Sequence, residues 1–343
     1  MKKTIFVVDD NLTNLTMAAR VLEEHYRVIT LSSAKAMFGL LEKIVPDLIL
    51  LDIQMPEVNG FEAMERLKAS EKFSAIPVIF LTGLTETESE AHGISLGAVD
   101  FITKPFSQPV LLTRIKNHLQ IDELIRERTA DLLEKTEQLS KLKNSIVFMM
   151  ADVVESRDAN TGGHIERTSE YMRILLDAML ANGIYTDEIK NWDINMVVCS
   201  ARLHDVGKIR IPDSILNKPG KLGDDEFQTM KTHSMEGGNI IDLMTLRTGD
   251  KEFLRSAKLS ATCHHEKWDG SGYPGGLSGE SIPLHGRIMA VVDVYDALTS
   301  ERPYKKAFDP DKAMEIIEEG SGQHFDPVIV KSFLNEKNRL MAV

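Results

Sequence analysis

The chain has 343 residues, of which 43% are hydrophobic and 27% charged, and its formal net charge is -12. This length exceeds that of most single hydrophobic cores, so we expect two domains, and the ordinary composition argues against long disordered stretches. The negative charge disfavours proteins that bind nucleic acid or anionic membranes along an extended surface, because both would be repelled.

The N-terminal segment and the cysteine content both bear on the cellular compartment. The N-terminal segment MKKTIFVVDD has too few apolar residues for a signal peptide, and no apolar run is long enough for a membrane helix. Only two cysteines are present, which makes a disulfide framework improbable. We therefore expect a cytoplasmic protein.

Five short apolar runs alternate with amphipathic stretches between residues 3 and 106. They are TIFVVDD, RVIT, DLILLDI, PVIFLTG and DFITKP. Such alternation is typical of a parallel sheet with helices on both faces. Ligands of these sheets bind beyond the carboxyl ends of the strands, so polar residues at those ends are the candidates for a site.

Three carboxylates and two other polar groups stand at these strand ends. Asp9 and Asp10 end the first run and Asp52 ends the third, while Thr82 and Lys104 end the fourth and fifth. The carboxylates would repel one another unless a hard cation such as Mg²⁺ lay among them. The hydroxyl and ammonium groups at the same edge would hold a phosphoryl group on Asp52.

With these residues, positions 1–120 resemble a bacterial response-regulator receiver domain, an α/β doubly wound, flavodoxin-like fold with a five-stranded parallel sheet. MPEVNG after Asp52 agrees with the family, as does the Lys104–Pro105 bond, which is expected to be cis, and Phe101 matches the family's aromatic switch. The resemblance implies a cognate sensor histidine kinase as partner. The implied roles are phosphorylation of Asp52, Mg²⁺ binding by Asp9, Asp10 and Asp52, and phosphoryl contacts by Thr82 and Lys104.

A helical pattern begins at Ser107, and no glycine or proline interrupts the chain from Val110 to Arg157. Ten positions from 121 to 153 alternate in steps of four and three; Arg128 and Lys135 interrupt, and the other eight are Ile121, Ile125, Leu132, Leu139, Leu142, Ile146, Met149 and Val153. This seam indicates either a parallel coiled coil between two copies of the chain or one long amphipathic helix packed on its own domain. We favour a homodimer with residues 121–145 as a helical coiled-coil linker.

The second half of the chain is almost entirely helical in pattern and contains scattered imidazoles and carboxylates. HDVGK begins at His204, a single His233 follows, HHEKWDGSGYPGG begins at His264, and Asp293 lies in an apolar helix, where an unpartnered carboxylate would be costly. Imidazole and carboxylate suit a divalent transition metal, and five or six ligands exceed the needs of one tetrahedral ion. We expect a two-metal hydrolytic site, since two ions can clamp the attacking and leaving oxygens of a phosphoester.

The adjacent residues His204 and Asp205 constrain this site. On a helix their side chains would point about 100° apart, so both reach one site only if it lies between them. Two metals would allow this arrangement, with Asp205 bridging the ions. Lys208, one turn beyond His204, is the candidate that meets the developing phosphoryl charge or protonates the leaving oxygen.

The segments that begin at His204, His264 and Val291 resemble the HD-GYP subgroup of HD-superfamily phosphohydrolases, with a match from about residue 146 to 333. Members hydrolyse cyclic di-GMP, and we place the corresponding all-α domain at residues 146–343. The implied metal ligands are His164, His204, Asp205, His233, His264, His265 and Asp293. By the same resemblance Arg302 and Lys305 would contact substrate phosphates beside Lys208. The aromatic rings of Tyr273 and Trp268 are candidates to stack on guanine, with packing in the loop an equal alternative for Trp268.

The triplet Gly272-Tyr273-Pro274 gives the family its name. The resemblance implies that it shapes a loop near the site and also contacts partner proteins, such as GGDEF-type signalling proteins.

The chain departs from the family at one position. Many members carry a glutamate four residues before the first histidine ligand, where it helps to hold a third metal, and here that position is Asn160. A neutral amide is a poor substitute for a carboxylate at a cationic site. We therefore expect two metals, iron or manganese, and by family analogy pGpG as the main product.

The leading hypothesis is a two-component response regulator in which phosphorylation of Asp52 controls hydrolysis of cyclic di-GMP. One alternative is a signalling adaptor that binds the dinucleotide or a partner protein through the Gly-Tyr-Pro loop. Another is a phosphodiesterase with a different substrate, such as cyclic GMP-AMP, pGpG or another nucleotide phosphoester. DNA binding is disfavoured, because no helix-turn-helix segment remains to be placed.

Overall fold

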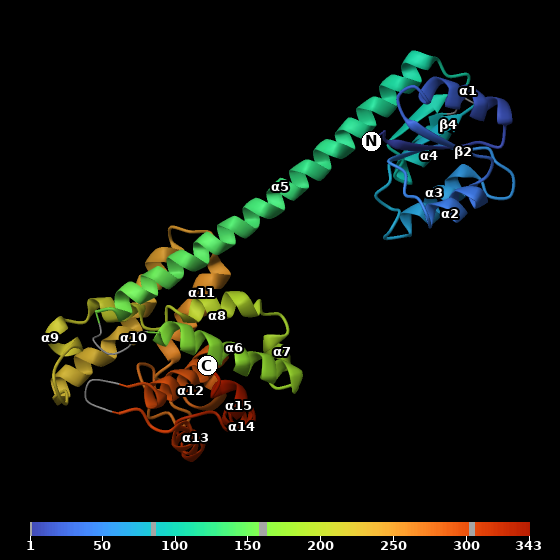
Figure 1. The fold of residues 1–343 in the computed structure, drawn as a ribbon. Helices are drawn as coiled ribbons and strands as arrows, with labels where there is room; N and C mark the ends of the chain where they lie inside the picture. The colour runs from blue at the N-terminus through green and yellow to red at the C-terminus, as the bar shows by residue number, and fades with distance from the viewer. Residues whose placement is uncertain (1, 84–86, 158–162, 302–305) are drawn as a thin grey trace. The chain divides into compact units, whose positions relative to one another are not determined.

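The structure is a computed structural model that describes residues 2–83, 87–157, 163–301 and 306–343 (Figure 1). The chain divides into two compact units, Met1–Thr136 and Glu137–Val343. The boundary falls inside helix α5 (Gln108–Glu155), so the uninterrupted helix expected from the sequence is confirmed. The domain limits 1–120, 121–145 and 146–343 stay a prediction.

The first unit contains the predicted five-stranded sheet. Its strands are β1 (Thr4–Val8), β2 (Arg27–Leu31), β3 (Leu48–Asp52), β4 (Val78–Thr82) and β5 (Asp100–Thr103). They lie in the order β2-β1-β3-β4-β5, and all neighbouring strands are parallel. This order is flavodoxin-like and confirms the predicted fold class of the unit. Every residue of β3 and β4 is buried, as expected for strands covered on both faces.

Helices cover both faces of this sheet. They are α1 (Leu12–Leu22), α2 (Ala34–Leu41), α3 (Gly60–Lys68), α4 (Thr87–Ser95) and the first part of α5. Because successive strand residues point to opposite faces, β1 contributes Ile5 and Val7 to the core under α1 and α5. Its Phe6 and Val8 enter the core under α2 and α3.

The second unit is built of helices joined by loops, and its described residues contain no β-strand. Beyond the end of α5, its elements are α6 (His164–Ala181), α7 (Thr186–Ile189), α8 (Ile194–Ala201), the 3-10 helix η1 (Val206–Arg210), α9 (Asp213–Leu216), α10 (Asp224–Thr245), α11 (Lys251–Cys263), the 3-10 helix η2 (Gly279–Ser281), α12 (Leu284–Thr299), α13 (Pro310–Glu319), α14 (Pro327–Asn335) and α15 (Lys337–Leu340). The larger core joins α6, α12 and α14, where Tyr295 contacts the rings of Tyr171 and Phe333 edge-on. The expected all-α architecture is confirmed.

The last turns of α5 belong to the second unit. Val147 and Val154 are buried in a smaller core with Leu203, Val206 and residues of α10 and α11. The eight apolar residues of the predicted seam lie on another face of α5 and are 49–66% exposed. The face of α5 that packs on its own unit is therefore not the seam.

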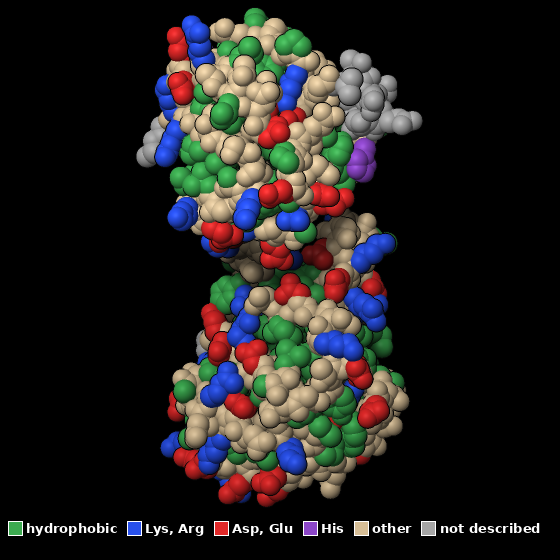
Figure 2. Space-filling view, turned by 90° about the vertical axis from the view of Figure 1, so that its right-hand side faces the viewer, with side chains coloured by type: hydrophobic (Ala, Val, Ile, Leu, Met, Phe, Trp, Pro, Cys, Tyr) green, Lys and Arg blue, Asp and Glu red, His purple; other side chains and the backbone are tan. Residues whose placement is uncertain are grey.

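Charge is mixed on the face of the molecule that Figure 2 draws. Acidic and basic side chains are interspersed on the face drawn in Figure 2, with apolar patches between them. Within the described residues no helix is long and apolar enough to cross a membrane.

Candidate phosphorylation site and metal centre

The carboxyl end of the sheet brings the predicted acidic residues together. One oxygen each of Asp9, Asp10 and Asp52 lie within 4.8 Å of one another, and Asp9 and Asp52 are buried while Asp10 is exposed. The ammonium group of Lys104 lies 2.6 Å from Asp9 Oδ2 and 2.8 Å from Asp52 Oδ1. Burial raises the pKa of Asp52, and Lys104 opposes that rise. The cluster of oxygens fits a hard cation such as Mg²⁺, which prefers carboxylate ligands.

Other predicted features of this site lie beside the acids. Thr82 is buried at the end of β4, and Phe101 is buried and stacks on Phe80 at a ring separation of 5.5 Å. The Lys104–Pro105 bond is cis, as expected. A Cβ atom on Gly60 would lie only 2.3 Å from the carbonyl oxygen of Asp52, so the close approach of α3 to β3 requires glycine in MPEVNG.

Four buried histidines of the second unit are oriented by hydrogen bonds at Nδ1. The bonds run from His164 to Asp296 (2.7 Å), from His204 to the carbonyl oxygen of Ala201 (3.0 Å), from His233 to that of Met230 (2.7 Å), and from His264 to those of Ser260 and Ala261 (3.0 Å each). A carbonyl or carboxylate oxygen accepts, so each Nδ1 holds the proton. Nε2 of each ring is thereby left as a ligand atom.

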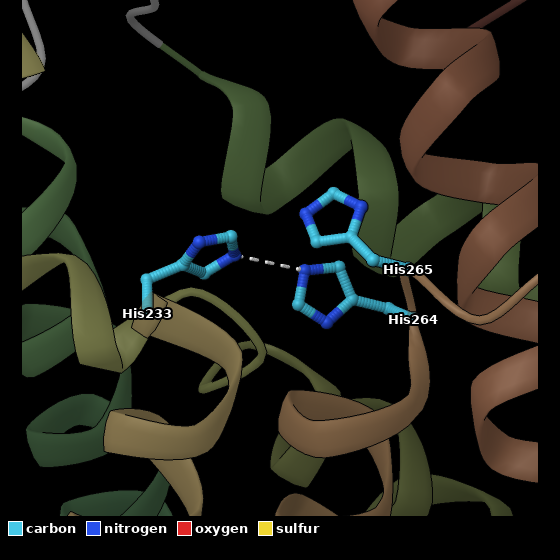
Figure 3. Close-up of side chains that lie close together, drawn as sticks. All are labelled: His233, His264 and His265. Carbon is cyan, nitrogen blue, oxygen red and sulfur yellow. Dashed lines mark hydrogen bonds between the residues drawn. The ribbon is translucent and has the colours of Figure 1, made fainter. Parts of the chain in front are cut away.

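The candidate ligand atoms gather in two adjoining clusters. His164, His204 and Asp205 form one, and His233, His264 and His265 form the other; within each cluster the ligand atoms lie within 4.8 Å of one another. Figure 3 shows the three imidazoles of the second cluster turned toward one another, with His233 on α10 and the other two at the end of α11.

Asp205 lies between the two clusters. Its Oδ2 is 3.5 Å from His204 Nε2, and its Oδ1 is 3.3 Å from His233 Nε2 and 3.7 Å from His264 Nε2. Asp293 Oδ1 lies 3.7 Å from His164 Nε2 and 3.9 Å from His204 Nε2. All seven residues of the ligand set that the sequence suggested are thus brought to one place.

The donor set fits cations. His164 and His204 face each other through Nε2 atoms 3.4 Å apart, and so do His233 and His264. With the protons held on Nδ1, each contact sets two lone pairs against each other, which a positive ion between them relieves. Mixed imidazole and carboxylate ligands suit a divalent transition metal.

The electrostatics keep most of these groups in their ligating forms. Burial lowers the pKa of His204, His233, His264 and His265, so their imidazoles are neutral. Burial acts in the same direction on His164, but its hydrogen bond to Asp296 and the charge of Asp293 outweigh it and raise the pKa.

The two carboxylates of the centre are ionised. Burial opposes ionisation of Asp205, but the ammonium group of Lys208 holds its pKa well below the usual range. The Lys208 ammonium lies 2.7 Å from Asp205 Oδ2. Asp293 also has a lowered pKa: burial opposes its ionisation, and His164, whose own pKa is raised, favours it.

The local structure of HDVGK differs from the expectation. His204 and Asp205 do not lie on an α-helix, because α8 ends at Ala201 and η1 begins at Val206. The turn between them, rather than rotation about a helix, presents both side chains to one site. A Cβ atom on Gly207 would lie 1.9 Å from the carbonyl oxygen of His233, so glycine lets η1 approach α10 and brings Asp205 beside His233.

The Gly-Tyr-Pro loop is held by a buried carboxylate. Glu266 accepts hydrogen bonds from the backbone N–H groups of Gly275 (2.6 Å) and Leu277 (3.0 Å). The ring of Tyr273 stacks on His265, with centroids 4.7 Å apart. The loop therefore lies directly beside the second cluster.

A cavity of about 280 Å³ opens at the centre. Its lining includes five of the seven candidate ligands with Lys208, and also Glu155 and Arg202. The sequence patterns did not single out these last two, since an isolated charged residue has no motif. They also missed Asp296, although its spacing of three from Asp293 on α12 puts both on one helix face. The predicted Arg302 and Lys305, and the departure at Asn160, lie outside the described residues.

Comparison with known families agrees with this geometry. Residues 5–116 match the response regulator receiver domain and residues 148–329, more than half of the chain, match the HD domain. The chain belongs to the response regulators that carry an HD-GYP phosphodiesterase domain. The resemblance drawn from the sequence motifs is confirmed.

Relatives of this response regulator have named activities. A "Probable cyclic di-GMP phosphodiesterase" of Vibrio cholerae is 39% identical over 99% of this chain and 79% of its own length. The "Cyclic di-GMP phosphodiesterase response regulator RpfG" of Xanthomonas campestris is 34% identical over 98% of this chain and 88% of its own. A "3'3'-cGAMP-specific phosphodiesterase 2" of Vibrio cholerae is 38% identical over 60% of this chain and 37% of its own.

We expect Asp296→Asn to weaken divalent metal binding by about 10- to 100-fold, the usual effect of removing the partner of a ligating histidine. Asp296 is buried and holds His164 Nδ1 at 2.7 Å and Arg167 Nε at 2.6 Å, and the amide removes its charge. The measurement is metal content per chain after dialysis against graded chelator. Asp242→Asn is the matched control, since that exposed carboxylate pairs with Lys258 away from the site. Equal metal retention in both variants would contradict the role of Asp296.

Proposed function

We propose that this response regulator hydrolyses cyclic di-GMP, mainly to pGpG, with two divalent ions held by the two histidine clusters. The observation that carries the proposal is the pair of facing Nε2 contacts with Asp205 between them. Iron or manganese suits this mixture of imidazole and carboxylate ligands. The names of the relatives that match nearly the whole chain support the substrate.

The residues around the metal centre would have different roles in the hydrolysis. When bound, the two ions would supply Lewis acidity and an activated water for attack on a phosphodiester. Asp205, with one oxygen toward each cluster, would hold the two sites at a fixed separation. Lys208 lies close enough to Asp205 to bind a phosphoryl oxygen or to protonate the leaving oxygen. Tyr273 would contact a guanine base, and the loop around it would contact GGDEF-type partners.

A second substrate is favoured by one observation. A relative that covers 60% of this chain carries the name of a 3'3'-cGAMP-specific enzyme. Both cyclic dinucleotides present phosphodiesters to the same cluster of ligands, and they differ in one base. Direct competition between the two separates these candidates.

Purified protein loaded with iron or manganese should convert cyclic di-GMP to pGpG. His204→Ala combined with Asp205→Ala should abolish turnover, because the first cluster then loses a histidine ligand and the two clusters lose the carboxylate between them. Products are separated by chromatography, with 3',3'-cGAMP as competitor. Asp242→Ala with Lys258→Ala, an exposed ion pair, is the matched double control. A fully metallated protein without turnover would disprove the activity, and GMP as the rapid product would contradict the two-metal assignment.

We also propose that phosphorylation of Asp52 by a cognate sensor histidine kinase, with Mg²⁺ held by Asp9, Asp10 and Asp52, controls this activity. Support comes from α5, which begins in the receiver and ends with Glu155 in the lining of the cavity. Just after it, Arg157 donates to the carbonyl oxygen of Ile209 at 2.7 Å and to Asp213 at 2.7 Å. A shift at the end of α5 would therefore reach the segment that follows HDVGK.

Beryllium fluoride with Mg²⁺, which mimics a phosphoryl group, should change the kcat of the wild-type protein and leave Asp52→Asn unchanged. The physical reason is that only the aspartate oxygen can complete the phosphoryl mimic beside Lys104. The measurement is the initial rate with cyclic di-GMP at saturating substrate. An equal response in both proteins, or none in the wild type, would refute control through Asp52.

The linker is proposed to join two copies of the chain as a parallel coiled coil. Its seam follows heptad spacing and is exposed along its length, including Leu132 at 63% and Leu139 at 66%. Another copy of the same helix would cover these side chains.

Leu132→Lys with Leu139→Lys should convert a dimer to a monomer, because charges in the seam must be desolvated on pairing. Molar mass by light scattering is the measurement. The matched control is Leu124→Lys with Leu133→Lys, two exposed leucines beside the seam. A monomeric wild type, or a seam variant that stays dimeric, would contradict the coiled coil.

A further inference from the structure

We propose that Arg202 binds the second, non-reacting phosphate of the dinucleotide in the cavity of the metal centre. The inference deepens the proposed function, since it rests on a substrate with two phosphodiesters.

The position of Arg202 places it on the cavity wall without making it part of the metal centre. It follows α8 directly and precedes His204 by two residues in the turn. It is half-buried and lines the cavity together with His164, His204 and Asp205. Among the described contacts its guanidinium makes no ion pair with Asp205 or Asp293, whereas Lys208 lies 2.7 Å from Asp205. Lys208 therefore serves the reacting phosphate and Arg202 a group farther along the substrate.

Two contacts anchor the guanidinium and leave its edge available. Nε donates to Ser169 Oγ at 3.1 Å, and the guanidinium carbon lies 5.7 Å from the centre of the Phe148 ring. The first contact uses one of five N–H donors and the second uses a face. The terminal N–H groups can still form two parallel bonds to a phosphate, the geometry for which guanidinium is suited.

Arg202 differs from the paired arginines of the second unit in having no carboxylate partner among the described residues. In the described part of the same unit, five arginines each lie within ion-pair distance of a carboxylate: Arg157 with Asp213, Arg167 with Asp296, Arg210 with Glu236, Arg287 with Asp326 and Arg339 with Glu336. Across residues 163–301 and the other described ranges, Arg202 has no such acidic partner.

The negative charge of the cavity lining explains why the substrate would need such a cation. Glu155, Asp205 and Asp293 contribute negative charge to its lining, and the whole chain carries -12. The metals and Lys208 would meet the charge of the reacting phosphate, and the second phosphate of a dianionic substrate would need a further cation on the same wall. In a half-buried setting that contact is stronger than it would be in water.

The test compares Arg202→Ala, Arg202→Lys and Arg210→Ala with the wild type, each loaded with metal. Cyclic di-GMP is one substrate, and bis(p-nitrophenyl) phosphate, which has one phosphodiester, is the other. Arg202→Ala should raise KM for the dinucleotide by about 10- to 100-fold, the cost of a lost charged hydrogen bond, with the small substrate unaffected. Arg202→Lys should recover only part, since an ammonium cannot form the paired bonds. Arg210→Ala, which removes an exposed arginine outside the lining, should match the wild type.

The outcomes separate this inference from the proposed function. An unchanged KM in Arg202→Ala would overturn it, and so would equal losses on both substrates with lowered metal content or melting temperature, which indicate a structural role. A wild type that does not hydrolyse cyclic di-GMP would refute the proposed activity. In that case, calorimetry with the phosphorothioate analogue of cyclic di-GMP tests the contact between Arg202 and the second phosphate. Weaker binding by Arg202→Ala than by the wild type supports the contact. Equal binding by both proteins, or no binding by the wild type, overturns it.

Discussion

Two pairs of imidazole nitrogens face each other at 3.4 Å in the second unit, and the carboxylate of Asp205 lies between the pairs. Opposed lone pairs and closely spaced carboxylates are unfavourable neighbours without positive charge. The ligands come from α6, the turn before η1, α10, the end of α11 and α12, so five separate segments converge on this repulsive point. The surrounding apolar cores must hold them there, and a divalent cation turns the same arrangement into a source of stability.

Hydrogen bonds behind the ligands make the arrangement specific. Three histidines donate Nδ1 to backbone carbonyls three or four residues earlier in their own segments, so secondary structure itself orients each ring. His164 instead depends on Asp296, which also binds Arg167. The close approach of η1 to α10, which needs Gly207, then sets Asp205 against His233. Each of these contacts links a ligand to the backbone or to a buried charge, as expected of a preorganised metal site.

The receiver also places buried carboxylates close together beside a positive charge. Asp9 and Asp52 are buried at neighbouring strand ends and share the ammonium of Lys104. A phosphoryl group on Asp52 would change the charge that Lys104 balances. Helix α5 begins in this unit and ends in the lining of the second site, while Arg157 ties the following residues to the segment after HDVGK. One covalently continuous helix thus connects two sites whose states both depend on the local balance of charge.

Much of this protein could be predicted from its sequence, because local patterns determine local structure. Alternating apolar runs predicted the five strands, and a long stretch without glycine or proline predicted α5. The spacing of histidines and acids, with the family resemblance, indicated the seven candidate ligands. The turn at His204 was not predicted, because a segment as short as HDVGK does not by itself distinguish a helix from a tight turn. Asp296 and Arg202 were also missed: the first acts through His164, 132 residues away, and the second is distinguished by its place in the lining of the cavity, which no motif marks. Only tertiary packing decides which distant charges meet, because such contacts depend on how whole helices settle against one another rather than on the order of residues within them.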